Sequence, residues 1–257
     1  MTNKFIPQVK ICGLTRVEHA LQCAALGADA IGCVFYPKSP RHLTDDQARK
    51  ICLSLPERIK TVGVFVNQTF SNIMHHVEFC HLSTVQLHGQ ESPELVRSLC
   101  KENLHVIKAL FIDGNPSLKD ASNYQASAFL VECGQGKLPG GNALQWNWEQ
   151  AKSFGETHPL IIAGGLSPEN VVHAIKVSSP HAVDVSSGVE SSPGHKDIDK
   201  VTLFFVVRIK ILYLAYILQK ILAFEYNFHL FLIGFWNLIH SCPVIAGADC
   251  DHANRYF

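Results

Sequence analysis

The sequence predicts an α/β fold, a (β/α)8 TIM barrel in which a closed parallel sheet of eight strands is surrounded by helices. Its 257 residues are close to the length of about 250 that is typical of one such barrel. Eight short apolar runs alternate with helical patterns, as repeated βα units do. No GxGxxG pattern opens the first turn, which argues against a dinucleotide-binding sheet.

Four predicted strands occupy the first half of the chain, at 9–14, 30–35, 60–66 and 84–89. Each is a run of apolar residues that ends at a polar or glycine-containing loop, as expected for strands covered on both faces. Apolar residues then recur at helical spacing. Thr15 and Thr44 are expected to cap the first two helices, and Ser92 with Pro93 to open the fourth. In the first helix the inward residues are expected to be Val17, Ala20, Leu21 and Ala24.

The second half supplies strands at 105–110 and 128–132, followed by two strands that begin at Leu160 and Ala182. These last two strands run straight into turns of small residues, whose backbone N–H groups few side chains can cover. Two such turns can hold one phosphate between them, and the usual phosphate site of a barrel follows strands seven and eight. We therefore expect the barrel to bind a phosphorylated small molecule.

The composition limits the partners and the compartment. Lys+Arg and Asp+Glu both number 22, so there is no basic field for nucleic acid. The nine cysteines form no CxxC pair and no metal-like spacing, which indicates free thiols in a reducing compartment. Residues 1–8 lack the apolar core of a signal peptide. We expect a cytoplasmic protein without a metal site.

The active site of a barrel lies at the C-terminal ends of its strands. The polar residues predicted there are Cys12, Arg41, His88, Glu132, Asp184 and Ser187.

Two of these residues could carry acid–base chemistry. Cys12 lies two positions after Lys10, whose positive charge would favour the thiolate form of the cysteine. The alternative is a buried cysteine that acts as an ordinary small apolar residue. Glu132 ends a run of four apolar residues, so burial could raise its pKa and suit it to donating a proton. The alternative for Glu132 is a carboxylate that accepts hydrogen bonds from loop amides.

Two others could bind substrate. Arg41 could clamp a carboxylate with two parallel hydrogen bonds, or it could be an ordinary surface arginine. His88 could line a pocket, or it could be a strand-end histidine whose hydrogen bonds are satisfied within the protein.

Six segments resemble one enzyme family. They are KICGL at 10–14, FYPKSPR at 35–41, VGVFVN at 62–67, VQLHG at 85–89, GGL at 164–166 and DVSSGVE at 184–190. In this order they resemble phosphoribosylanthranilate isomerase, an enzyme of tryptophan biosynthesis. The resemblance covers residues 9 to about 205.

The resemblance implies an Amadori rearrangement without a cofactor, from N-(5-phosphoribosyl)anthranilate to 1-(2-carboxyphenylamino)-1-deoxyribulose 5-phosphate. Glu132 would protonate the ring oxygen of the sugar and open it to a Schiff base. Cys12 would then take the C2 proton, giving an enolamine that tautomerises to the ketone. Arg41 would hold the anthranilate carboxylate, and Asp184 and His88 would contact substrate. The phosphate would bind to Gly164, Gly165, Ser187 and Gly188.

Two positions depart from the family pattern. Glu132 stands where the family usually has aspartate, which lengthens the acid's arm by about one carbon–carbon bond. Ala143 stands in the following loop where another glycine is usual.

Other functions fit these residues less well. A sugar-phosphate epimerase or an indole-glycerol-phosphate synthase would need metal ligands, or a catalytic lysine with paired glutamates, at the strand ends. A non-catalytic, membrane-tethered barrel with a decayed site is a further alternative, against which the retained Cys12, Arg41 and phosphate turns argue.

The barrel is expected to occupy residues 1–208, followed by an atypical apolar extension at 209–257. Three interpretations of the extension compete: non-native sequence from a frameshift or read-through, a membrane- or partner-binding appendage, and a longer last helix. Its apolar runs at 211–218 and 228–239 are shorter than the roughly 20 residues of a membrane span. The protein is expected to be a monomer or a homodimer.

Overall fold

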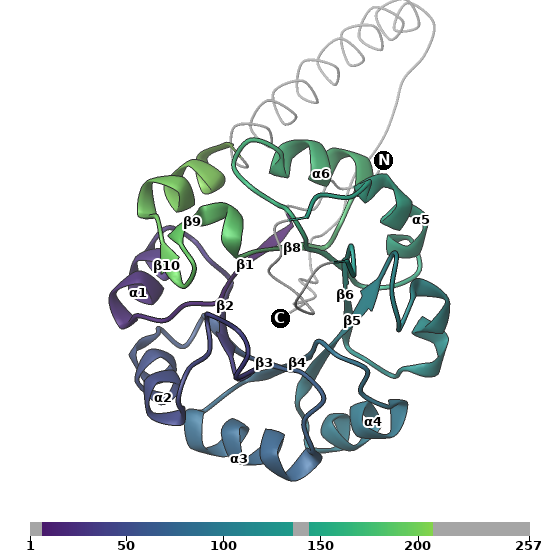
Figure 1. Cartoon of the computed structure of the whole chain (residues 1–257), viewed down its shortest axis with the longest axis horizontal. Coiled ribbons are helices and arrows are strands. Elements are labelled where there is room, and N and C mark those ends of the chain that lie inside the picture. The colour runs from purple at the N-terminus through teal and green to yellow at the C-terminus, as the bar shows by residue number, and fades with distance from the viewer. Residues whose placement is uncertain (1–6, 136–143, 208–257) are drawn as a thin grey trace, which may run out of the picture. The chain divides into compact units, whose positions relative to one another are not determined.

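The computed structural model describes residues 7–135 and 144–207, and within them the predicted eight-stranded parallel barrel closes (Figure 1). The strands follow one another around the barrel in chain order, and the last pairs with the first. They are β1 (Gln8–Cys12), β2 (Ala30–Val34), β3 (Lys60–Phe65), β4 (Thr84–Leu87), β5 (His105–Phe111), β6 (Ala128–Glu132), β7 (Leu160–Ile162) and β8 (Ala182–Val185). The extension at 209–257, to which the three interpretations apply, lies outside the described residues.

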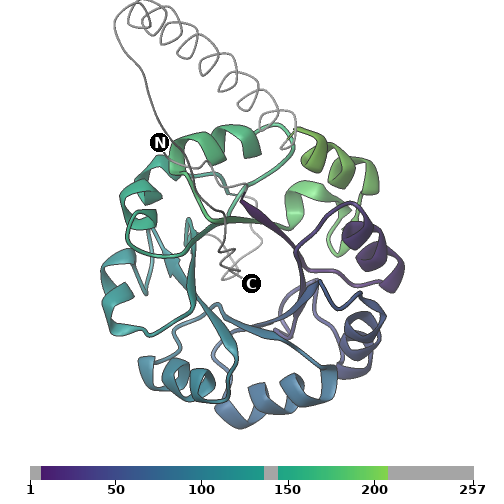
Figure 2. The same cartoon turned by 180° about the vertical axis from the view of Figure 1, so that it is seen from behind.

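Helices surround the ring of strands, as both views down the barrel show (Figures 1 and 2). The longer ones are α1 (Val17–Ala25), α2 (Asp45–Ser54), α3 (Phe70–Cys80), α4 (Pro93–Lys101), α6 (Val171–Ser178) and the helical residues 198–207.

The helical layer is thinner on one side than the sequence pattern indicated. Only the 3-10 helix η1 (Leu118–Asn123) lies between β5 and β6, and η2 (Trp148–Ala151) with the four-residue α5 (Lys152–Gly155) precedes β7. The segment before η1 contains Gly114 and Pro116, which oppose a longer helix. After β8 the chain forms η3 (Ser187–Val189) and a small hairpin of β9 (Glu190–Ser192) and β10 (His195–Lys196).

The predicted helix starts are confirmed at two of three places. Thr44 and Ser92 accept hydrogen bonds from backbone amides in the first turns of α2 and α4. The predicted cap by Thr15 is wrong, because its hydroxyl donates to the carbonyl of Gly194 near the β9–β10 turn, and α1 starts after Arg16 instead. Leu21 was expected to face inward but is 41% exposed, because the buried face of α1 consists of smaller residues.

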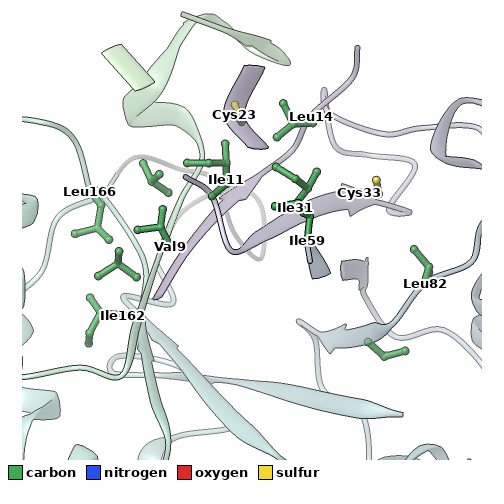
Figure 3. Close-up of a cluster of buried hydrophobic side chains, with 14 of the residues drawn as sticks. Val9, Ile11, Leu14, Cys23, Ile31, Cys33, Ile59, Leu82, Ile162 and Leu166 are labelled. Atoms are coloured by element: carbon green, nitrogen blue, oxygen red, sulfur yellow. The ribbon is translucent and has the colours of Figure 1, made fainter. Parts of the chain in front are cut away.

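Side chains alternate along each strand between two apolar cores. The larger core lies between the barrel and its helices, and Figure 3 shows Val9, Ile11 and Ile31 within it. The smaller core fills the barrel interior and includes Ala30 and Ala182. Lys10 pairs in register with Ala30, and therefore shares its face of the sheet and points inward.

Candidate active site

A cleft opens at the C-terminal ends of the strands, which is where the barrel prediction placed the site. The predicted site residues that line it are Cys12, Arg41, His88, Glu132, Gly164, Gly165, Asp184 and Ser187. Gly188, the remaining one, directly follows Ser187. Among the described residues, no group of three or more His, Cys, Asp and Glu is arranged to hold a metal ion.

Glu132 ends β6 and is held by a histidine from the loop after β4. Its Oε1 lies 2.9 Å from Nε2 of His88, and Nδ1 of His88 lies 2.9 Å from Nε2 of Gln86. Because an amide N–H can only donate, the Gln86 contact leaves Nδ1 as an acceptor and puts the imidazole proton on Nε2, facing Glu132. Both ring nitrogens of His88 are thus engaged by protein side chains, whereas Oε2 of Glu132 has no partner among the described residues.

Cys12 ends β1 beside a buried ion pair. Nζ of Lys10 donates to Oδ2 of Asp184 at 2.6 Å, between neighbouring strands β1 and β8. Burial raises the pKa of the Cys12 thiol, and the positive charge of Lys10 opposes this rise. Cys12 itself is half-buried and lines the cleft, so a substrate can reach its sulfur.

Arg41 follows β2 and forms a side-on pair with the hairpin after β8. Its Nε and Nη2 donate to the two carboxylate oxygens of Glu190, at 2.9 and 2.7 Å. Lys196 also donates to Oε1 of Glu190, at 2.7 Å. Burial works to raise the pKa of Glu190, but Arg41 and Lys196 together lower it below its ordinary value. The pairing fixes the guanidinium and leaves its Nη1 end for another partner.

The small-residue turns after β7 and β8 lie against each other. A Cβ at Gly188 would come within 1.8 Å of the carbonyl oxygen of Leu166, so the contact is backbone against backbone. Gly164 and Gly165 have φ of +82° and +67°, which favour glycine. Among the described residues, the amides of Gly164, Gly165 and Ser187 have no hydrogen-bond acceptor. These amides are therefore free to bind an anion.

The indole rings of two tryptophans hold the first of these turns in place. Trp146 donates from Nε1 to the carbonyl of Ala163, and Trp148 donates to that of Gly164. Neither tryptophan was singled out from the sequence, because a tryptophan in a loop has no pattern that distinguishes an anchor from an ordinary apolar residue.

The comparisons with known proteins agree on one family. The family model described as N-(5'phosphoribosyl)anthranilate (PRA) isomerase matches residues 9–207. The chain belongs to this family. Members isomerise N-(5'-phosphoribosyl)anthranilate in tryptophan biosynthesis, as the sequence motifs predicted. The family match excludes the alternative assignments as a sugar-phosphate epimerase or an indole-glycerol-phosphate synthase.

Individual members of the isomerase family are similar over most of their length. The N-(5'-phosphoribosyl)anthranilate isomerase of Desulfatibacillum aliphaticivorans is 53% identical over 197 residues, which cover 77% of this chain and 90% of that protein. The crystal structure of the Thermotoga maritima isomerase is 40% identical with a TM-score of 0.74, and covers 79% of this chain and 99% of that one. A further isomerase structure, 39% identical with a TM-score of 0.71 and the same coverage, holds reduced 1-(o-carboxyphenylamino)-1-deoxyribulose 5-phosphate.

Proposed function

We propose that Cys12 and Glu132 are the general base and general acid of the isomerase reaction. The observation that carries the proposal is that both side chains line one cleft, from β1 and from β6, with a distinct set of polar neighbours each. A base and an acid in different environments are what two successive proton transfers require.

Glu132 would act first. Its Oε2 would carry the proton to the ring oxygen of the furanose, and the bond from that oxygen to C1 would break to leave a Schiff base with the anthranilate nitrogen. The carboxylate that remains would keep its hydrogen bond from Nε2–H of His88. A donor already aimed at the oxygen that gains charge stabilises this step without reorganisation. His88 would therefore act through Glu132.

Cys12 would act second, as a thiolate. It would take the proton from C2 of the Schiff base, and the electron pair would move towards the imine carbon to give the enolamine. The enolamine then tautomerises to the ketone. No oxidant, reductant or cofactor enters the balance of these steps, because the product is an isomer of the substrate.

Arg41 and the two small-residue turns would hold the ends of the substrate. Glu190 occupies Nε and Nη2 of Arg41, so Nη1 and the second proton of Nη2 form a fork that fits the anthranilate carboxylate. The free amides of Gly164, Gly165 and Ser187, with that of Gly188 beside them, would bind the phosphate. Asp184 also lines the cleft and would contact the sugar.

The test is the loss of anthranilate fluorescence when the purified protein meets freshly made N-(5'-phosphoribosyl)anthranilate. We expect turnover by the native chain and none measurable by Cys12→Ser or Glu132→Gln, which each keep the size of the side chain. Circular dichroism shows whether both variants are folded. A folded Cys12→Ser or Glu132→Gln variant that turns over at the native rate would contradict the assignment.

The remaining expectations concern the assembly and the compartment. That the protein is a monomer or a homodimer, and that it works in the cytoplasm, both stay predictions. One solved relative from Thermotoga maritima is described as a dimeric isomerase that was converted to monomers. In the described part of the chain, no helix is both long and apolar enough to cross a membrane.

A further inference from the structure

Lys10 is a fully buried lysine inside the barrel, and the acid–base scheme above gives it no role. Lysine is almost never fully buried unless it is paired. The neighbouring strands leave room for its long side chain, because its register partner on β2 is Ala30 and the next inward residue there is Gly32. On the other side of β1, the register partner of Lys10 on β8 is Asp184.

The Lys10 side chain and the Cys12 thiol both pack against Gly32 of β2. The two residues point into the barrel from the same strand, two positions apart. A Cβ placed on Gly32 would lie 2.7 Å from Sγ of Cys12 and 3.1 Å from Cε of Lys10. The missing side chain of Gly32 therefore makes the space in which the ammonium end of Lys10 approaches the sulfur.

The charges around Cys12 act in opposite directions on its thiolate. Burial raises the pKa of Cys12, Lys10 lowers it, and Asp184 raises it by less than Lys10 lowers it. Lys196 from β10 also lowers the pKa of Cys12. Arg41 and the buried thiol Cys33 also interact electrostatically with Cys12. In turn, burial disfavours the ammonium of Lys10, but Asp184 and Cys12 raise its pKa above the ordinary value.

We propose that Lys10 is a positioning residue for the isomerisation, because its ammonium, held inside the barrel by Asp184, stabilises the thiolate of Cys12. The ion pair has two effects. Asp184 keeps Lys10 charged and holds Nζ of Lys10 at 2.6 Å from its own Oδ2. The negative charge of Asp184 also offsets part of the effect of the Lys10 charge on the Cys12 sulfur. The proposal deepens the proposed function and rests on Cys12 being the base.

The experiment measures the rate at which iodoacetamide alkylates Cys12 as a function of pH, in the substrate-free full-length protein. The thiolate is the reactive form, so the midpoint of the profile reports the pKa of Cys12. Tryptic cleavage after Lys10 and Arg16 releases residues 11–16, in which Cys12 is the single cysteine, so mass spectrometry separates it from the other thiols. In a Lys10→Met variant, cleavage after Lys4 gives residues 5–16, again with Cys12 alone.

Both single variants are expected to raise the midpoint. Lys10→Met removes the positive charge and should raise it by about one pH unit, which makes alkylation roughly tenfold slower at a fixed pH below the midpoint. Asp184→Asn removes the carboxylate that keeps the buried Lys10 charged and in place, so the midpoint should rise in this variant too. The double variant Lys10→Met/Asp184→Asn leaves no unpaired charge, and its midpoint should lie between those of the native protein and Lys10→Met. The double variant provides the measurement if Lys10→Met does not fold.

Loss of packing alone would expose Cys12 and lower the midpoint, because burial raises the pKa of its thiol. A lowered or unchanged midpoint in Lys10→Met, or a native midpoint in the double variant, would therefore overturn the proposal. The alkylation profile is independent of turnover. If Cys12→Ser is as active as the native chain while Lys10→Met still moves the midpoint, the role of Cys12 as base fails and the stabilisation of its thiolate stands.

Discussion

The Glu132 carboxylate reaches His88 with one methylene more than an aspartate at this position would have. In this chain the longer arm ends 2.9 Å from Nε2 of His88, which Gln86 orients from its other side. The glutamate side chain is therefore long enough to accept this hydrogen bond from His88.

Shortening the acid should therefore lower the rate. We expect Glu132→Asp to lose about 10²-fold in kcat, since a misplacement of roughly 1 Å can cost that much. Its KM should change little, because the substrate is held at its carboxylate and phosphate. Glu132→Gln is the matched control: it keeps the length but has no acidic proton to give. Steady-state fluorescence assays measure both, and a glutamine variant as active as the aspartate variant would contradict the acid role.

At the residue scale, the sequence predicted the groups that face the cleft but not what holds them. Lys10 and Gln86 do leave a signal, because each is a polar residue in the middle of an otherwise apolar strand. The pairing of Arg41 with Glu190 leaves none, since the two are 149 positions apart and meet only when the barrel closes. His88 was expected to contact substrate, and its hydrogen bonds to Glu132 and Gln86 depend on a fold that no local pattern contains.

At the scale of elements, the β9–β10 hairpin fixes the guanidinium of Arg41. Glu190 begins the hairpin and Lys196 ends it. The carboxylate of Glu190 pairs with both Arg41 and Lys196. Because the folded state lowers the pKa of Glu190, its ionised form contributes stability above the ordinary pKa of a glutamate. This contribution is lost as the pH falls through the lowered value in the folded protein.

Glu190→Gln should therefore change how stability depends on pH. We expect the variant to be less stable than the native chain at pH 7, with the difference in Tm shrinking as the pH falls below about 4. Thermal unfolding followed by circular dichroism between pH 3 and pH 7 measures it. Glu156→Gln, at an exposed position, controls for the loss of one carboxylate. Native and Glu190→Gln curves that run parallel over the whole range would contradict the account.

The strands were predicted more accurately than the helices between them. All eight strands were identified because each is a continuous apolar run, and the structure moves their ends by only a few residues. The general alternation of strands with helical patterns is weakest between β5 and β6, where a short segment with glycine and proline forms only the 3-10 helix η1. The cap at Thr15 was wrong because a tertiary contact, the carbonyl of Gly194, competes for the same hydroxyl.

At the scale of the whole molecule, closing the barrel brings the proposed acid and the proposed base to one cleft. Cys12 and Glu132 are 120 positions apart in the chain, and β7 and β8 separate their strands on one side of the ring. The helical residues 198–207 cover the junction near β1 and bury Val201, Phe204 and Phe205. The family model ends at residue 207 as well. The described barrel thus includes every residue to which a role in the reaction is assigned.

The division of labour between Glu132 and Cys12 is tested most directly by single-turnover kinetics with substrate that carries deuterium at C2. We expect deuterium to slow the native enzyme, because the proposed thiolate base, Cys12, would break that bond. In Glu132→Asp the opening of the sugar ring becomes slow, so the effect of deuterium should shrink. An isotope effect that stays the same in Glu132→Asp while its rate falls would contradict the assignment of ring opening to Glu132.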